Sequence, residues 1–385
     1  MKRSRPECKS PRLHQKEHHR CSFFINIISK YIDRHLFECY NFSRKQIRSE
    51  KMREIINDAL HDNLFKERPL YAFNEAEDYF SWKKRIKEKY NEILRIDQIK
   101  KNACELKIEI EECVKKDGYT RYRYVFESEK GCFVPCYLLI PDGEKEKYPV
   151  CICLQGHTSG FHISIGEPKD EQDKKDVVSQ DFGIEAVKHG FIALCIEQRG
   201  MGERQPKATN TRSNGCMFTA MTALILGRTL IGERVWDVSR AIDTLSYFEK
   251  ADINDITCIG HSGGGTATYY SACYDERIKT AVSSCSICSY KDSIGGKYYH
   301  CTCNYLPDCA KYFDMGELAC LIAPRKLILT AGVKDPIFDI KGIREIYQVV
   351  AKIYEKENAK GKCELIETDK EHYFSKDIVF NKIKK

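Results

Sequence analysis

The stretch Ile256-Thr-Cys-Ile-Gly-His-Ser-Gly-Gly-Gly265 decides the fold. It begins as an apolar, β-branched run typical of a buried strand and continues into Gly260-His261-Ser262-Gly263-Gly264, which matches the pattern G-x-S-x-G. This pattern predicts a nucleophile elbow, a sharp strand-to-helix turn that lifts the serine hydroxyl above a sheet. Small residues flank Ser262 because the strained backbone and the close approach of strand and helix leave little room for a Cβ atom.

Short apolar runs on both sides of the elbow indicate a buried sheet. They lie at 150–154, 191–196, 256–259, 279–284 and 326–331, and helical patterns at 177–189, 232–250, 264–275 and 341–357 alternate with them. Continuously apolar strands are buried on both faces, and strand–helix alternation predicts a mostly parallel, doubly wound α/β sheet with flanking helices. Before these runs, segments 105–113, 119–127 and 132–140 predict an antiparallel meander.

A serine hydroxyl needs a base and an orienting acid to act as a nucleophile near neutral pH. In chains with this elbow, the acid and then the histidine follow the serine. Asp335 lies just beyond a predicted strand and is favoured over Asp339, which lies farther from that strand end. His372 follows the last predicted strand, 363–368. We therefore predict a catalytic triad of Ser262, Asp335 and His372.

Two backbone N–H donors are expected to stabilise the oxyanion. Gly263, directly after the serine, supplies one, and the loop 154–160 supplies the other through His157 or Thr158. His157 could also be interpreted as a metal ligand, but the sequence offers no partner with suitable spacing.

Several further segments resemble the α/β-hydrolase superfamily and, within it, the bacterial acetylxylan-esterase-like family, which is related to the dienelactone hydrolases. Glu197-Gln-Arg-Gly-Met-Gly202 is similar to an Asp-x-Arg-Gly-x-Gly segment that follows a core strand in many members. Residues 234–245 are similar to the helix before the elbow, and 300–307 and 321–327 resemble segments of the same family. The resemblance spans residues 130–380. It implies an α/β-hydrolase fold and a serine esterase that needs no cofactor.

From the triad and this resemblance we expect hydrolysis of a carboxylic ester through an acyl-enzyme on Ser262. The acyl group is expected to be short, with acetyl on a carbohydrate as the candidate substrate. Two alternatives stay open: a peptidase or acyl-aminoacyl hydrolase of the same fold, and a non-catalytic binding protein built on it. The complete order of serine, aspartate and histidine weighs against the second alternative.

Four residues are candidates for substrate binding. His261 adjoins the serine and is expected to shape the pocket wall, and Arg199 follows a predicted strand end. Tyr290 and Tyr305 could stack on sugar rings or aryl groups. Ordinary packing of the tyrosines and a buried ion pair at Arg199 are the competing interpretations.

The chain contains 20 cysteines, but it is too long for a small disulfide scaffold, and we expect reduced thiols in a cytoplasmic protein. Cys285, Cys288, Cys301, Cys303 and Cys309 suggest a zinc site together with His300. Because Cys-x-Cys is not the usual zinc knuckle, packing is the favoured interpretation, and we expect no metal.

Charge is unevenly distributed along the chain. Residues 1–51 hold thirteen Lys and Arg against five Asp and Glu, so the rest of the chain is nearly neutral although the net charge is +7. We therefore expect a basic, disordered extension at 1–51, a helical segment at 52–104 and a catalytic domain at 105–385 with insertions at 201–231 and 285–320. A small-molecule ester is the expected partner, with no nucleic acid and no membrane.

Overall fold

The computed structural model describes residues 58–207, 215–296 and 300–384. The extension expected at 1–51 and parts of both expected insertions lie outside these residues. Residues Asp62–Lys385 form one compact unit built around a single sheet.

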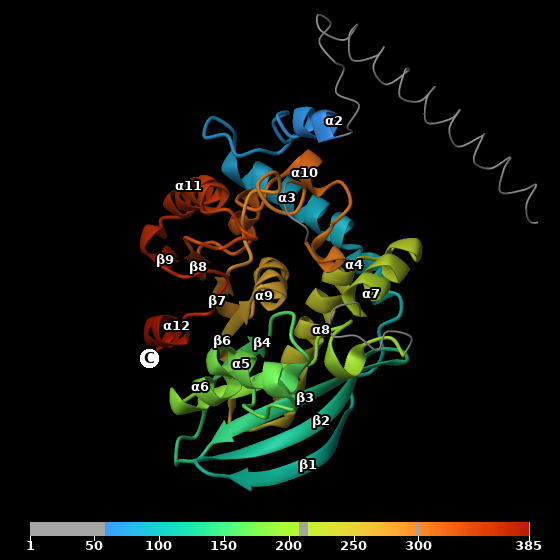
Figure 1. The fold of residues 1–385 in the computed structure, drawn as a ribbon, viewed down its shortest axis with the longest axis vertical. Helices are drawn as coiled ribbons and strands as arrows, with labels where there is room; N and C mark the ends of the chain where they lie inside the picture. The colour runs from blue at the N-terminus through green and yellow to red at the C-terminus, as the bar shows by residue number, and fades with distance from the viewer. Residues whose placement is uncertain (1–57, 208–214, 297–299, 385) are drawn as a thin grey trace, which may run out of the picture. The chain divides into compact units, whose positions relative to one another are not determined.

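The sheet has nine strands in the order β1-β2-β3-β5-β4-β6-β7-β8-β9, which can be followed in Figure 1 from β1 at the bottom to β9 at the upper left. Strands β1, β2, β3 and β5 pair antiparallel, and the pairs from β5 through β4 and β6 to β9 are parallel. The mostly parallel sheet with a preceding meander is therefore confirmed. The strands are β1 (Ile108–Lys116), β2 (Tyr119–Glu129), β3 (Cys132–Pro141), β4 (Tyr148–Leu154), β5 (Ile192–Ile196), β6 (Ala251–His261), β7 (Ile278–Ser284), β8 (Lys326–Gly332) and β9 (Cys363–Thr368).

Helices cover both faces of the sheet. Side chains of α3, α4, α8, α9 and α11 form the larger core on one face, and α6 and α12 close the other. Along β4, Ile152 belongs to the first core, and Cys151 and Cys153 belong to the second, which explains why this strand is apolar at every position. The helices are α2 (Asp58–Leu64), α3 (Tyr79–Leu94), α4 (Ile96–Lys100), α5 (Glu171–Gln180), α6 (Phe182–Lys188), α7 (Gly215–Ile225), α8 (Leu230–Thr244), α9 (Gly263–Tyr274), α10 (Cys309–Tyr312), α11 (Ile340–Lys356) and α12 (Lys376–Ile383).

Two helices predicted as continuous are broken. Within the helical segment expected at 52–104, α3 begins after Asp78, which caps it by accepting from the Ser81 N–H. This helix is separated from α4 because Arg95 between them adopts the left-handed conformation with φ 62°. Likewise, 177–189 divides at Asp181 into the end of α5 and α6. Hydrophobic periodicity continues across both breaks, so it does not reveal a single residue with non-helical dihedrals.

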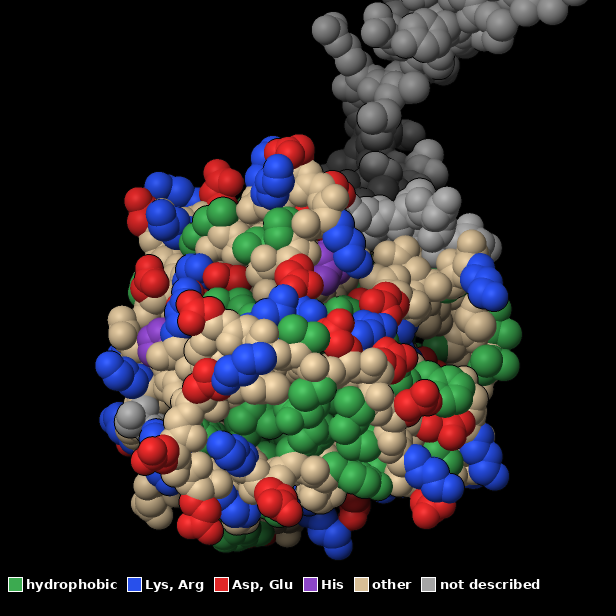
Figure 2. Space-filling model, turned by 90° about the horizontal axis from the view of Figure 1, so that it is seen from below, with side chains coloured by type: hydrophobic (Ala, Val, Ile, Leu, Met, Phe, Trp, Pro, Cys, Tyr) green, Lys and Arg blue, Asp and Glu red, His purple; other side chains and the backbone are tan. Residues whose placement is uncertain are grey.

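Among the described residues, no single helix is long and apolar enough to cross a membrane. In this described part of the chain, one pair of helices passes that test by length and composition, Gly215–Ile225 with Leu230–Tyr247, and the pair is bent by 100°. Figure 2 shows the face seen from below Figure 1, where Lys and Arg side chains alternate with Asp and Glu around a patch of hydrophobic side chains. The charge on this face is therefore mixed in sign.

Candidate active site

Ser262 lies at the turn between β6 and α9, as the elbow pattern predicts. Its backbone has φ 53° and ψ −122°, a conformation that is strained for a residue with a side chain. A Cβ atom on Gly264 would lie 2.0 Å from the Leu154 carbonyl oxygen, and one on Gly260 would lie 2.3 Å from the Gly264 oxygen. Both positions therefore require glycine, and the half-buried Ser262 stays in reach of solvent.

Asp335 and His372 are brought together at the carboxyl ends of β8 and β9. His372 Nδ1 lies 2.7 Å from Asp335 Oδ2, and the other carboxylate oxygen accepts the N–H groups of Ile337 at 2.8 Å and Phe338 at 3.2 Å. Burial raises the pKa of Asp335, but its bonds to His372 and to the backbone outweigh that effect and hold the pKa below its ordinary value. Asp335 is therefore an ionised acceptor that fixes the imidazole. Asp339, the competing candidate, caps α11 instead by accepting from the Lys341 N–H at 2.8 Å.

Two rings hold His372 beside the elbow. The His261 ring centroid lies 4.7 Å from that of His372, and Phe338 stacks on His372 at 5.9 Å with an interplanar angle of 13°. Since His261 directly precedes Ser262, this packing places the imidazole of His372 next to the serine turn. Burial first, and then the neighbouring His372, lower the pKa of His261 to about 3. His261 is therefore a neutral side chain packed beside His372.

The predicted oxyanion loop approaches the elbow closely. A Cβ atom on Gly263 would lie 2.5 Å from Cε1 of His157, so the imidazole packs directly against this glycine. The Thr158 N–H donates to the Gly156 carbonyl at 2.8 Å and is thus already engaged. Of the two predicted donors in this loop, the His157 N–H is the better candidate.

Glu197 forms hydrogen bonds with residues of the same loop. It is fully buried and accepts from Gln155 Nε2 at 2.9 Å and from the N–H groups of Phe161 at 3.3 Å and Glu203 at 3.2 Å. Burial raises its pKa to about 7 against the opposing effect of these bonds. A carboxyl group at this position, where the resembled family usually has aspartate, therefore ties the loop after β5 to the loop after β4.

Two of the predicted substrate contacts are wrong. Arg199 is buried, and carboxylate oxygens of Glu129, Asp237 and Glu233 lie 2.5, 2.8 and 3.3 Å from its guanidinium, so it serves the ion-pair role. Tyr290 lies in the core, where its hydroxyl is 2.8 Å from that of Tyr270. Neither side chain has surface left for a substrate.

Tyr305 remains a candidate for substrate binding because it is 48% exposed. It lines a pocket of about 270 Å³ together with α7 residues Met221 and Leu224 and with Pro307. The lining is mainly apolar, so the pocket suits an apolar or sugar-ring surface more than a charged one.

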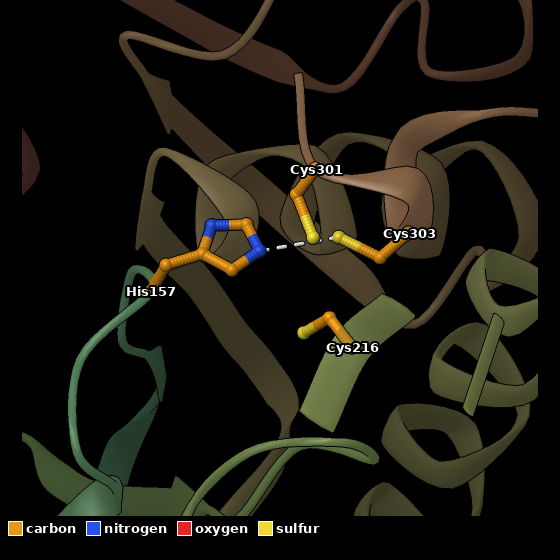
Figure 3. A group of neighbouring side chains, drawn as sticks. All are labelled: His157, Cys216, Cys301 and Cys303. Atoms are coloured by element: carbon orange, nitrogen blue, oxygen red, sulfur yellow. Dashed lines mark hydrogen bonds between the residues drawn. The ribbon is translucent and has the colours of Figure 1, made fainter. Parts of the chain in front are cut away.

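A group of four side chains was missed by sequence reasoning. The side chains point toward one another in Figure 3. His157 comes from the loop after β4 and Cys216 from the start of α7. Cys301 directly precedes the short helix η4 (Thr302–Asn304), and Cys303 lies within it. Hydrogen bonds with the thiols of Cys301 and Cys303 lower the pKa of the Cys216 thiol, against the effect of burial. Sequence spacing could not find this group, because its members come from three distant segments. The zinc interpretation had joined Cys301 and Cys303 to Cys285 and Cys288, but Cys285 lies instead beside Asp335 and His372.

The fold and the elbow define a class of protein, the hydrolases built on a mostly parallel sheet with a serine at a strand-to-helix turn. The chain belongs to the Abhydrolase family, whose model matches residues 41–363.

Three similar proteins fit this family assignment. "Putative hydrolase YtaP" of Bacillus subtilis (strain 168) is 27% identical over 227 residues, which cover 57% of this chain and 71% of that protein. Among solved structures, a "putative acetyl xylan esterase" of Bacteroides fragilis NCTC 9343 superposes with a TM-score of 0.72 at 18% identity, covering 86% of this chain and 96% of that one. A glucuronoyl esterase from Solibacter usitatus has a TM-score of 0.57 at 16% identity and covers 81% and 95%. At these identities the two structural likenesses show the shared fold.

Proposed function

We propose that this protein is a serine esterase that removes a short acyl group from a carbohydrate. The observation that carries the proposal is the 2.7 Å contact between Asp335 and His372, with the His372 ring packed on His261 beside the strained Ser262 turn. A buried, ionised acid that orients a half-exposed histidine is the arrangement that activates a serine hydroxyl.

The proposed reaction follows from these positions. His372 donates its Nδ1 proton to the bond with Asp335, which leaves Nε2 free to take the proton of the Ser262 hydroxyl as Oγ attacks the ester carbonyl. The N–H groups of Gly263 and His157 hold the oxyanion. The alcohol then leaves with the proton from His372, and a water molecule, activated by the same imidazole, cleaves the acyl-enzyme.

The substrate class draws support from the esterases of similar fold. One is described as a "putative acetyl xylan esterase" and another as a glucuronoyl esterase, and both names refer to ester bonds. The largely apolar pocket lined by Tyr305 would offer a stacking surface to a sugar ring.

The test compares the wild type with Ser262→Ala on p-nitrophenyl acetate, on acetylated xylo-oligosaccharides and on a methyl ester of glucuronic acid. We expect turnover of the first two substrates by the wild type and none above background by the variant. Ser246→Ala, which removes an exposed serine in the 3-10 helix Leu245–Tyr247 that follows α8, is the matched control and should retain full activity. Equal activity of Ser262→Ala and wild type would refute the serine mechanism, and turnover of only the glucuronate ester would refute the acyl-carbohydrate assignment.

A further inference from the structure

The donor atoms of His157, Cys216, Cys301 and Cys303 all lie within 4.8 Å of one another (Figure 3). His157 Nε2 lies 3.2 Å from Cys303 Sγ, and all three cysteines are free thiols. Cys216 and Cys303 are buried, Cys301 is half-buried, and His157 has an exposed side, so the group is enclosed by protein but open to solvent at one edge.

This donor set fits one kind of ion. Three thiolates and one imidazole form a Cys₃His set, a common structural site for zinc, with Zn–S bonds of about 2.3 Å and Zn–N bonds of about 2.0 Å. Tetrahedral geometry then puts neighbouring donor atoms roughly 3.5–3.8 Å apart. Since the four atoms already lie within 4.8 Å, small side-chain movements of the order of 1 Å would close the site.

Arg234 provides a second, independent observation. Its guanidinium is almost completely buried, it donates to Cys216 Sγ at 3.1 Å, and its Nη1 has no hydrogen-bond partner. Within the described residues no carboxylate lies within ion-pair distance of Arg234, unlike the neighbouring Arg199 and Arg204. A buried cation needs a counter-charge. A zinc ion with three thiolates carries one net negative charge, and Arg234 would neutralise it.

We propose that His157, Cys216, Cys301 and Cys303 bind one zinc ion, with displacement of the thiol protons. The ion joins the loop after β4 to both insertions, since Cys216 lies in 201–231 and the other two cysteines lie in 285–320. Four protein ligands fill its coordination, so it serves as a structural staple with no open position for a substrate. From the sequence we expected no metal, and the four donor side chains speak against that expectation.

The structural zinc ion would lie at the edge of the candidate active site. The His157 imidazole packs on Gly263, so an ion on Nε2 would fix the loop that supplies the second oxyanion donor. This consequence rests on the proposed esterase function, whereas zinc binding itself does not. His157 is thus proposed as a positioning residue through its side chain.

The first test measures metal content in the full chain purified without chelators. We expect about one zinc per chain in the wild type and in Ser262→Ala, and well below half of that in Cys303→Ser and Cys301→Ser. Cys113→Ser is the matched control, because Cys113 is exposed on β1, and it should keep the ion. If Ser262→Ala binds zinc like the wild type, zinc binding does not depend on esterase activity. The zinc proposal can then hold even if the protein hydrolyses no ester.

The second test does not depend on any variant folding. Wild-type protein, reduced and reconstituted with Co²⁺, should show thiolate-to-cobalt charge transfer and the strong visible bands of a tetrahedral ion. Zinc near zero together with no such spectrum would overturn the proposal. So would peptide mapping that finds Cys216, Cys301 or Cys303 joined in a disulfide in the freshly purified protein.

Discussion

Asp335 and Asp339 belong to the same segment after β8 but have different partners, His372 for the first and the α11 N-terminus for the second. Replacing Asp335 by Asn keeps its shape but favours the wrong tautomer of His372. We expect Asp335→Asn to lower kcat by roughly 10³- to 10⁴-fold with little change in KM. Steady-state kinetics on p-nitrophenyl acetate would measure this.

Asp339→Ala is the matched control for that experiment. It should cost about 1 kcal/mol of the free energy of unfolding through the lost cap and leave kcat unchanged. The reverse pattern, with kcat lost in Asp339→Ala and kept in Asp335→Asn, would show that the acid has been misassigned.

Arg199 illustrates how a motif residue can be structural. Three carboxylates surround it in a buried network that also contains Arg204 and Arg228, so Arg199→Ala leaves three buried carboxylates with only these two cations. We expect a loss of about 3–5 kcal/mol in urea unfolding and an unchanged KM in the protein that remains folded. A raised KM with an unchanged free energy of unfolding would indicate that Arg199 binds the substrate.

At the scale of elements, the core strands and the elbow were predictable because their signals are local. The apolar run of β6 and the glycines beside Ser262 specify strand, turn and helix within a few residues. The proximity of Asp335 and His372 was predictable from chain order. The helix break at Arg95 and the partners of His157 were not, because the first depends on one backbone conformation and the second on packing between distant insertions.

The loops after β4 and β5 are coupled through Glu197, and this coupling depends on pH. Burial raises the pKa of Glu197 in the folded protein from 4.5 to about 7. The contribution of Glu197 to the free energy of unfolding is therefore fully present below pH 4.5 and is lost as the pH rises through 7. Glu197→Gln removes this dependence. Relative to wild type, the free energy of unfolding of the variant should therefore increase by about 3 kcal/mol between pH 4.5 and pH 8.

Urea unfolding at several pH values would measure that difference. The variant also alters the hydrogen bonds to Gln155 and the backbone, but this shifts the difference equally at every pH. A difference that stays constant with pH would show that Glu197 is ionised in the folded protein like an ordinary glutamate.

At the scale of the whole molecule, the sheet needs its N-terminal helices. Trp82, Ile86 and Tyr90 of α3 are at most 1% exposed and belong to the larger core. A chain that begins at residue 105 would expose this face of the core, so we expect it to aggregate. A chain that begins at residue 58 should unfold cooperatively, and differential scanning calorimetry of the two would compare them. Cooperative unfolding of the shorter chain at an unchanged melting temperature would contradict the assignment of α3 to this core.

Ser262 at the elbow is the proposed nucleophile. The most direct measurement is mass spectrometry of the protein after reaction with a fluorophosphonate, followed by peptide mapping of the adduct. We predict one adduct per chain on Ser262 in the wild type, and none in Ser262→Ala or in His372→Ala. An adduct on another residue, or a wild type that does not react while it hydrolyses esters, would contradict the account.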